Sequence, residues 1–381
     1  MKITIFGTLP PLKGNAYYCW LAAKALSEKV FVEFISFKKL YPEKLYPGGV
    51  SENSHEFSVS PTDQLKIKRL VTYYNPLSWI RSAFLASSKV IILQWWSLPV
   101  GFIWIFVIVI LRLRKKVVFL TVHNVFPHEK SFGYRFVFKI VCFFSNRYFV
   151  HTEINKKQLV DSFNISKSKI HIVSMGIHDL YLDSENISKQ ESRARLNIDK
   201  NIKMVLLFGN IRDYKGVKEF LEAASLLKQM MGNFLFVIAG EKWIDWKDYD
   251  NFIKDNQLEG LVKTYLKYIP MREVKYFFTA CDLVVLPYRH FDAQSGVGNI
   301  ALAFHKALLV TRVGGLTDLV KDERAVIERL NAVDLASKIK EVLQDEALNV
   351  KLAKDSKELS QYYSWNRFAD ETISAIEKLN S

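Results

Sequence analysis

Residues 203–240 read KMVLLFGNIRDYKGVKEFLEAASLLKQMMGNFLFVIAG, and this stretch predicts the fold of the region around it. One apolar run ends at Gly209, and a helix-length segment beginning near Val217 repeats apolar residues at three- and four-residue spacing. A second apolar run then ends at Gly240. A strand, a helix and a strand in this order predict a parallel sheet covered by helices.

The same alternation extends to both ends of the chain. In the first half, five apolar runs are predicted strands: KITIFG, VFVEFISF, VIILQW, KVVFLTVH and NRYFVHT. We expect an α/β protein with two doubly wound, Rossmann-like domains facing a central cleft. The predicted parts are an N-terminal domain at 1–178, a polar linker at 179–200, a C-terminal domain at 201–364, and a last helix at 365–381 that packs back on the first domain.

Composition and charge restrict the function. The chain has 381 residues, a net charge of +14 and three widely spaced cysteines without a CxxC pair. Few cysteines argue against a disulfide framework and a zinc site, and fit a cytoplasmic protein. The basic balance predicts an anionic partner or surface. No helix-turn-helix, zinc-finger or RNP pattern occurs, so we expect no nucleic-acid partner.

The most apolar segment is LPVGFIWIFVIVIL at 98–111. It is shorter than the roughly 20 residues that a spanning helix needs. Two alternatives remain, a buried core helix and a helix at an anionic membrane surface, where QWW at 94–96 would also fit. In the second case four cations would contact headgroups: Arg112, Arg114, Lys115 and Lys116. The N-terminus has no signal-peptide pattern, and we expect peripheral association with the inner face of the membrane.

The loop FGNIRDYKG at 208–216 contains the first candidate site. Arg212 and Lys215 precede the start of the predicted helix, and cations beside a helix N-terminus favour an anion. A planar guanidinium and an ammonium together suit a diphosphate. The alternative is an ordinary solvated loop.

A second candidate is PYRHFDAQSGVGNIALAF at 287–304. Ser295 and Gly296 would present backbone N–H groups, and Gln294 a side-chain amide, at the start of a helix. GVGNIA also fits the dinucleotide pattern G-x-G-x-x-A, which would indicate an NAD(P)-dependent oxidoreductase. That pattern should follow the first strand of its domain directly, and here RHFDAQS intervenes. We therefore favour a different phosphate ligand.

Four motifs, in order and spacing, resemble those of the group 1 glycosyltransferases of family 4, which have the GT-B fold: FGNIRDYKG, FVIAGE, ACDLVVLPYRHFDAQSG and VTRVGGL. The first half agrees more loosely, through PPLKGN at 10–15 and TVHN at 121–124. The resemblance implies a nucleotide-sugar donor and three catalytic residues, His123, Arg212 and Lys215. It implies donor contacts at Gly14, Asn15, Gly209, Asp292, Gln294, Ser295, Gly296 and Val297.

The largest departure from the family pattern lies in 287–304. The family usually has two glutamates, and the alignment places Asp292 at the first and Ile300 at the second. Isoleucine cannot hydrogen-bond the ribose hydroxyls that the second glutamate normally holds. The AQSG variant resembles a subset of the family that presents Gln-Ser-Gly to the donor. A non-catalytic GT-B nucleotide- or glycan-binding protein is therefore an alternative.

The resemblance implies a retaining hexosyltransferase that needs no metal and no cofactor. Its acceptor would be a glycan or a lipid-linked sugar at the membrane surface, in polysaccharide or glycoconjugate synthesis. A single D-x-D, Asp248 and Asp250 in WKDYDNF, would suit Mg²⁺, but it lies in a polar helical stretch and we interpret it as a solvated face.

Overall fold

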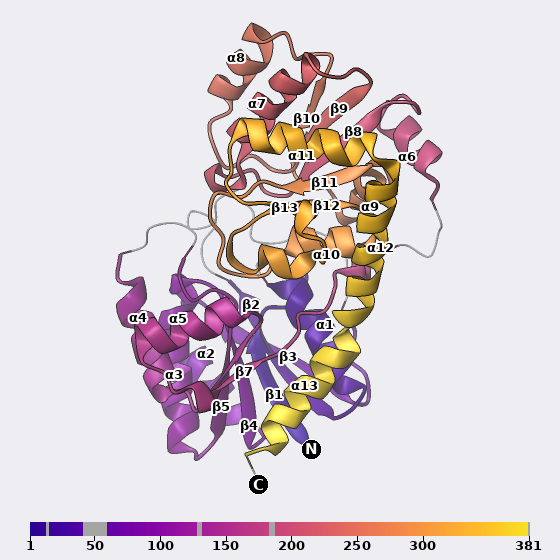
Figure 1. The fold of residues 1–381 in the computed structure, drawn as a ribbon. Coiled ribbons are helices and arrows are strands. Elements are labelled where there is room, and N and C mark those ends of the chain that lie inside the picture. The colour runs from indigo at the N-terminus through magenta and orange to yellow at the C-terminus, as the bar shows by residue number, and fades with distance from the viewer. Residues whose placement is uncertain (13–14, 41–58, 128–131, 183–186, 380–381) are drawn as a thin grey trace. The chain divides into compact units, whose positions relative to one another are not determined.

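A computed structural model describes residues 1–12, 15–40, 59–127, 132–182 and 187–379. The chain divides into two compact units. The first is Met1–Gly176 together with Tyr363–Ser381, and the second is Ile177–Tyr362 (Figure 1). The chain therefore enters the second unit once and returns to the first unit with its last helix.

The first unit contains a seven-stranded sheet in the order β3-β2-β1-β4-β5-β6-β7. All its neighbouring strands are parallel. The strands are β1 Lys2–Gly7, β2 Phe31–Lys39, β3 Leu65–Thr72, β4 Val90–Trp95, β5 Val117–Val122, β6 Arg147–Val150 and β7 Ile170–Ile172. The order reverses at β1, between β2 and β4, so loops at the carboxyl ends of β1 and β4 diverge there.

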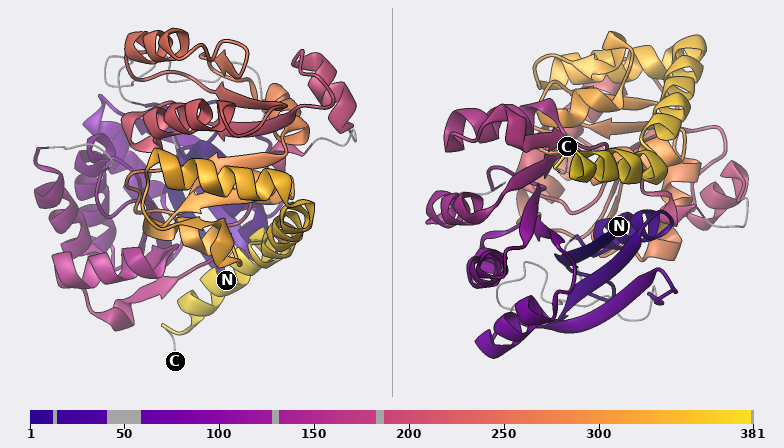
Figure 2. Two further views of the ribbon diagram at one scale, coloured as in Figure 1. Left: turned by 45° about the horizontal axis from the view of Figure 1, so that its top comes forward. Right: turned by 90° about the horizontal axis from the view of Figure 1, so that it is seen from below.

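Helices cover both faces of this sheet. On one face α2, α3, α4 and α5 enclose the main core, and on the other α1 packs against α13 (Figures 1 and 2). The helices are α1 Ala16–Ser27, α2 Pro76–Leu85, α3 Leu98–Leu113, α4 Tyr134–Phe144, α5 Glu153–Phe163 and α13 Trp365–Glu377, with a 3-10 turn η2 at Lys167–Lys169. Thr152 caps α5 by accepting from the backbone N–H of Asn155, which fixes where that helix begins.

Helix α3 corresponds to the apolar segment of 98–111. Its inward side chains, among them Ile103, Trp104 and Val107, are completely buried, so the core interpretation holds for this face of the helix. Of the described helices, none is both long and apolar enough to cross a bilayer. The QWW stretch does not lie at the surface as one hydrophobic anchor, because Trp95 is fully buried and its Nε1 donates to the Tyr134 hydroxyl at 2.8 Å.

The second unit contains a six-stranded sheet in the order β10-β9-β8-β11-β12-β13, again parallel throughout. Its strands are β8 Lys203–Phe208, β9 Phe234–Ala239, β10 Val262–Tyr265, β11 Leu283–Leu286, β12 Leu308–Thr311 and β13 Val326–Ile327. The strand order reverses at β8, between β9 and β11. The loops that follow β8 and β11 are therefore the natural ligand-binding loops of this unit.

The second unit has seven α-helices among its described residues. They are α6 Lys189–Arg195, α7 Val217–Lys228, α8 Lys247–Asp255, α9 Met271–Ala280, α10 Gly296–Ala303, α11 Ala332–Gln344 and α12 Glu346–Tyr362. Four of them, α7, α8, α11 and α12, enclose a second core built on β8, β9 and β11. Short 3-10 turns are η3 Asp179–Tyr181, η4 Asp213–Lys215, η5 Gly314–Leu319 and η6 Glu323–Ala325. The three cysteines, Cys19, Cys142 and Cys281, are buried free thiols.

The segment expected as a linker, 179–200, differs from that expectation. Its described residues belong to the second unit and include α6, which begins with a reciprocal capping box between Ser188 and Glu191 and packs against α9. The polarity of this segment therefore reflects helix capping and ion pairing, not exposure of a free connector. The final helix α13 packs against α1 within the first unit.

Candidate active site

Lys215 lies at the end of the short η4 turn that joins β8 to α7. Although it is a lysine, only 4% of its surface is exposed. Its Nζ donates to the Phe208 carbonyl at 3.3 Å and to the Tyr288 hydroxyl at 2.9 Å. Burial lowers the pKa of this ammonium, the charge of Arg212 lowers it further, and Tyr214 opposes both effects. Among the described residues no carboxylate pairs with it, so this buried charge is balanced by neutral groups alone.

Two glycines allow this arrangement of the β8–α7 loop. Gly216 has φ +69°, and a Cβ there would lie 1.8 Å from the Pro287 carbonyl oxygen. A Cβ on Gly209 would lie 3.1 Å from the Lys215 Nζ and 2.9 Å from a methyl of Val297. The missing side chain at Gly209 therefore leaves the ammonium approachable from the carboxyl end of β8.

Arg212 begins the same turn, three residues before Lys215. Its guanidinium lies over the Trp243 ring, 4.0 Å from the centroid, in a cation–π contact. The structure therefore places both predicted cations on one loop, but with different environments. Lys215 is buried among polar atoms, whereas Arg212 stacks on an aromatic ring.

The β11–α10 loop packs against the β8–α7 loop. The Arg289 backbone N–H donates to the Tyr214 carbonyl at 2.7 Å, and the Phe291 ring stacks on Tyr214 with centroids 6.0 Å apart. Asp292 follows Phe291 directly on this loop. These contacts bring the two loops that were predicted separately from sequence into one site.

Helix α10 begins beside Lys215. Ser295 is its N-cap, and the Ser295 hydroxyl accepts from the Gly298 backbone N–H at 3.2 Å. The Tyr288 hydroxyl lies 3.5 Å from the Ser295 hydroxyl, so Tyr288 links the lysine to the start of the helix. The lysine and the amide end of α10 are thus adjacent, and both favour negative charge.

The G-x-G-x-x-A pattern falls within α10 and has a packing explanation. A Cβ on Gly298 would lie 2.3 Å from a methyl of Leu319, so this position needs glycine for close contact between α10 and η5. Ile300, at the position of the family's second glutamate, is buried with 5% exposure. Neither residue offers a polar group to a ligand.

Two polar side chains around the start of α10 have buried atoms without a protein partner. The Gln294 Oε1 is buried and accepts no hydrogen bond from the described residues. Asn299, fully buried, has neither its Nδ2 nor its Oδ1 paired. An unpaired buried polar atom costs about 1–3 kcal/mol, which a bound ligand or water would recover.

His178 is a residue of this site that the sequence did not indicate. Its Nε2 is buried without a partner and would lie 3.8 Å from a Cβ on Gly296. Burial lowers its pKa to about 4, so the imidazole is neutral at pH 7. It is the last residue of the predicted N-terminal domain, but it belongs to the second unit, and only the chain's path against α10 brings it to the site.

In the first unit, His123 follows β5 at the carboxyl edge of the sheet. Its Nε2 donates to the Gln94 Oε1 at 2.8 Å, and its ring lies edge-on to Tyr18 with centroids 4.6 Å apart. Burial and the neighbouring His151 hold its pKa well below the usual range. His123 is therefore a neutral imidazole whose orientation Gln94 fixes.

Tyr18 and His151 complete a cluster around His123. The His151 Nδ1 donates to the Val173 carbonyl at 3.0 Å, and burial lowers its pKa to about 4. Its Nε2 and the Tyr18 hydroxyl are buried without partners among the described residues. The unpaired Nε2 adds an acceptor that the sequence did not reveal.

The loop after β1, which contains PPLKGN at 10–15, is described only in part. Gly14 lies outside the described residues. Asn15 occupies the N-cap position of α1, but its side chain makes no capping bond, and its Nδ2 is buried without a partner. This side-chain amide is one more unpaired donor at the carboxyl edge of the first sheet.

The two aspartates of the D-x-D motif lie on α8 and do not form a metal-binding cluster with other described side chains. Asp248 and Asp250 are exposed, and the Asp250 carboxylate accepts from the Trp246 indole at 2.8 Å. Across the described part of the chain, no three histidine, cysteine or acidic side chains gather in a metal-binding cluster. Neither aspartate lies on the β8–α7 or the β11–α10 loop.

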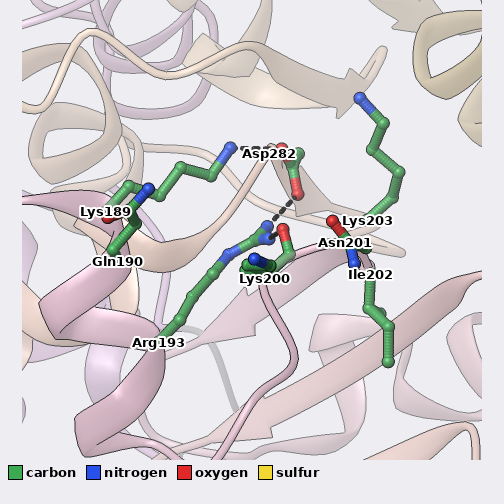
Figure 3. A pocket seen from close by; sticks show the side chains of 8 residues that line it. All are labelled: Lys189, Gln190, Arg193, Lys200, Asn201, Ile202, Lys203 and Asp282. Carbon is green, nitrogen blue, oxygen red and sulfur yellow. Dashed lines mark hydrogen bonds and ion pairs between the residues drawn. The ribbon is translucent and has the colours of Figure 1, made fainter.

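A cavity of about 600 Å³ opens at the opposite, amino-terminal edge of the second sheet (Figure 3). The Arg193 Nη2 pairs with the Asp282 carboxylate at 2.7 Å, and the Lys189 Nζ reaches the same carboxylate at 2.5 Å. Asp282 also accepts from the Met204 backbone N–H at 2.7 Å. This polar network anchors α6 to the sheet, and its charges are already paired, so we assign it a structural role.

Residues 188–359, nearly the whole second unit, match the family described as Glycosyl transferases group 1. An uncharacterized glycosyltransferase of Methanocaldococcus jannaschii is 30% identical over 167 residues, covering 42% of this chain and 44% of the relative. The N,N'-diacetylbacillosaminyl-diphospho-undecaprenol alpha-1,3-N-acetylgalactosaminyltransferase of Campylobacter jejuni is 27% identical over 241 residues, covering 61% of this chain and 60% of the relative. The chain thus spans about half the length of these curated relatives.

The structure of HepE from Anabaena in complex with UDP matches 99% of this chain and 100% of its own, with a TM-score of 0.75 and 13% identity. At this identity the likeness shows the fold. Together with the two parallel α/β units, it confirms the GT-B architecture expected from the sequence motifs.

Proposed function

Because residues 188–359 belong to the group 1 glycosyltransferase family, we propose that this chain transfers a hexose-type sugar from a nucleotide-sugar donor to a glycan or lipid-linked acceptor. The observation that carries the proposal is the buried, carboxylate-free ammonium of Lys215 beside the N-terminus of α10. Burying an ammonium without a carboxylate partner is costly, and an anion bound there would offset that cost.

In the proposed reaction, the bond between the anomeric carbon and the diphosphate breaks, and negative charge grows on the leaving diphosphate. Lys215 and the backbone amides that begin α10 stabilise that charge, and Arg212 adds a second cation on the same loop. Gly209 leaves room for a phosphate oxygen against the lysine. Because protein cations neutralise the leaving group, the proposal requires no metal or other cofactor.

Gln294 offers a replacement for the missing ribose-binding glutamate. Ile300 is buried and apolar, whereas the Gln294 Oε1 is an unpaired acceptor just before the start of the same helix. A ribose hydroxyl donating to this oxygen would satisfy it. Replacing Gln294 by leucine should then weaken binding of a nucleoside diphosphate more than binding of pyrophosphate, which has no ribose.

The neutral cluster of the first unit suits a sugar more than a phosphate. His123, His151 and Tyr18 provide aromatic surfaces and hydrogen-bonding atoms without formal charge. In the proposal His123 contacts the reacting sugar by a hydrogen bond, and the sugar keeps its anomeric configuration without a protein nucleophile. A neutral imidazole at this position avoids repelling an oxocarbenium-like transition state.

The proposed acceptor is a glycan or a lipid-linked sugar at the inner face of the membrane, in polysaccharide or glycoconjugate synthesis. The name of the similar Campylobacter jejuni transferase specifies a diphospho-undecaprenol acceptor, which supports this choice. The net charge of +14 also supports work near anionic headgroups.

A non-catalytic sugar-nucleotide binding protein is the second candidate, favoured by the buried Ile300. One experiment separates the two. The protein is incubated with a panel of nucleotide sugars and lipid-linked acceptors, with and without EDTA, and nucleoside diphosphate release is measured. The proposal predicts acceptor-dependent release that EDTA leaves unchanged, and an NMR spectrum of the product with the donor's anomeric configuration. Tight donor binding without release, across the panel, would favour the binding protein.

A further inference from the structure

The outer surface of helices α2, α3 and α4 is apolar where a water-facing helix should be polar. Seven large side chains are each more than half exposed: Leu77 and Phe84 on α2, Phe102, Phe106 and Leu113 on α3, and Phe136 and Phe143 on α4. Within each helix they are spaced four or seven residues apart and so share one stripe. We call this surface the α2–α3–α4 face.

The three stripes lie on neighbouring helices. Helix α3 packs against both α2 and α4, and the three helices lie in a row on the same side of the first sheet (Figures 1 and 2). The Trp79 and Phe106 rings are in contact, with centroids 5.6 Å apart, which joins α2 to α3. Soluble proteins rarely expose large contiguous apolar patches without a partner.

Core packing does not explain these side chains. Helix α3 already contributes Ile103, Trp104 and Val107 to the core through its inner face. Phe102 and Phe106 lie on the opposite face of the same helix. The helix is therefore apolar on both sides. Because a helix that is apolar all round is normally surrounded by apolar groups, the outer side of α3 is also expected to meet an apolar environment.

The charges around the face have a single sign. From Tyr73 to Val150 the sequence contains ten lysines and arginines and one acidic residue, Glu129. Arg81, Arg135 and Lys139 are exposed on α2 and α4 themselves, and Lys115 follows α3. None of these cations is paired with a carboxylate among the described residues.

We propose that the α2–α3–α4 face docks on the surface of an anionic phospholipid membrane, with its aromatic side chains at the acyl boundary and its cations on the headgroups. Apolar side chains flanked by unpaired cations match an anionic lipid surface, which offers both chemistries together. A second copy of the chain is a poor match, because an isologous contact would bring like charges together.

The docking proposal rests on the proposed function for its purpose, which is delivery of the donor site to a lipid-linked acceptor. It refines the expectation from sequence in two ways. The contact spreads over three helices, and the side chains concerned are outward phenylalanines and leucines, since much of the 98–111 segment is core. Arg114 already makes a hydrogen bond within the protein, because its Nη1 donates to the Ala83 carbonyl at 2.7 Å, so it has fewer donors left for a headgroup.

The test is flotation of the full-length protein with vesicles of phosphatidylcholine alone or mixed with phosphatidylglycerol. We expect binding to the anionic vesicles that weakens as salt is raised. Replacing Phe136 and Phe143 together by serine should lower the partition coefficient about tenfold or more. The matched control replaces Val333 and Val350, which are exposed on α11 and α12, by serine and should float like the wild type.

A charge variant separates the two contributions. Arg135→Gln with Lys139→Gln should weaken binding to anionic vesicles about fivefold per cation and leave binding to neutral vesicles unchanged. Circular dichroism and binding of a nucleoside diphosphate, measured on the same preparations, verify that each variant is folded.

Two results would overturn the docking proposal. One is a wild-type protein that floats with neither vesicle while still binding a nucleoside diphosphate, which would leave the proposed function standing. The other is a dimer in sedimentation equilibrium that Phe136→Ser with Phe143→Ser dissociates, which would assign the face to a second copy. Vesicle binding without any nucleoside diphosphate binding would instead support docking and contradict the proposed function.

Discussion

The carboxyl edges of the two sheets have opposite chemistry on the same scaffold. In the second unit the edge holds the buried ammonium of Lys215 and the amide end of α10. In the first unit the edge holds His123, His151 and Tyr18. Burial lowers the pKa of both histidines and raises the pKa of the tyrosine, so all three side chains are neutral at pH 7. One edge is therefore positively charged, and the other is uncharged and largely aromatic.

This difference shows how one type of fold supports two chemically different edges. A parallel sheet always gathers loop residues at its carboxyl edge, so the scaffold fixes where a ligand binds but not which ligand. In the second unit, glycine and lysine in the β8–α7 loop create a positively charged site. In the first unit, aromatic residues at the same edge create a neutral one.

The largest effect is expected from the loop that distinguishes the second unit. Gly216→Ala should lower the free energy of unfolding by about 3 kcal/mol, because the new Cβ meets the Pro287 carbonyl and a left-handed conformation disfavours alanine. Chemical denaturation measures this change. Gly232→Ala is the matched control, since a Cβ there meets nothing within 4 Å, and it should change stability by less than about 0.5 kcal/mol. Equal effects of both variants would contradict the close packing of the two loops.

Acidification should destabilise both edges through their buried histidines. The pKa of His151 and of His178 is about 4 in the folded state, below the ordinary value of 6.5. The unfolded chain therefore binds more protons between pH 6.5 and 4, so stability is complete above pH 6.5 and falls as the pH decreases through that window. From pH 7 to pH 5 each histidine should cost up to about 2 kcal/mol.

The denaturation midpoint at the two pH values measures this loss, and His178→Gln should remove one histidine's share of it. A midpoint that stays constant between pH 7 and pH 5 would show that these imidazoles are not buried in the neutral form.

A change in the neutral cluster should affect turnover more than donor binding. His123→Ala should lower kcat/KM about tenfold through loss of one hydrogen bond to the sugar, with little change in affinity for the nucleoside diphosphate. His171→Ala, on β7 at the edge of the same sheet, is the control and should retain normal turnover. If His123→Ala weakened nucleoside diphosphate binding as much as turnover, the division between the two edges would be wrong.

The smallest expected effect concerns the hydroxyl that connects Lys215 to Ser295. Tyr288→Phe removes one acceptor from the lysine and should lower kcat/KM about threefold to tenfold, since a single hydrogen bond contributes about 0.5–1.5 kcal/mol. Steady-state kinetics measure this change. A larger loss than for His123→Ala would show that Tyr288 itself contacts the donor.

Much of the architecture follows from local pattern. Strands such as β8 and β9 are continuous apolar runs because both faces of their sheet are buried. Strand β3 lacks that signal, since LKIKRLVT is an edge strand and mostly half-exposed, and the sequence did not indicate it. The segment 179–200 resembled a linker because its charges pair with Asp282, a partner 89 residues from Arg193.

The site was predictable where one loop carries its chemistry and unpredictable where distant segments meet. Lys215 and Ser295 were expected from motifs, and the structure adds their connection through Tyr288. His178 and the unpaired atoms of His151 and Tyr18 depend on packing between segments far apart in sequence. No local spacing encodes such a contact.

The central claim is that Lys215 binds the diphosphate of the donor. Isothermal titration calorimetry with UDP, GDP and ADP tests it most directly, comparing the wild type with Lys215→Ala and with the exposed control Lys218→Ala. We predict that at least one nucleoside diphosphate binds the wild type and the Lys218→Ala variant equally. Loss of the charged contact in Lys215→Ala should weaken that binding by about 2–3 kcal/mol, or roughly 30- to 150-fold. Unchanged affinity in a folded Lys215→Ala variant would contradict the claim.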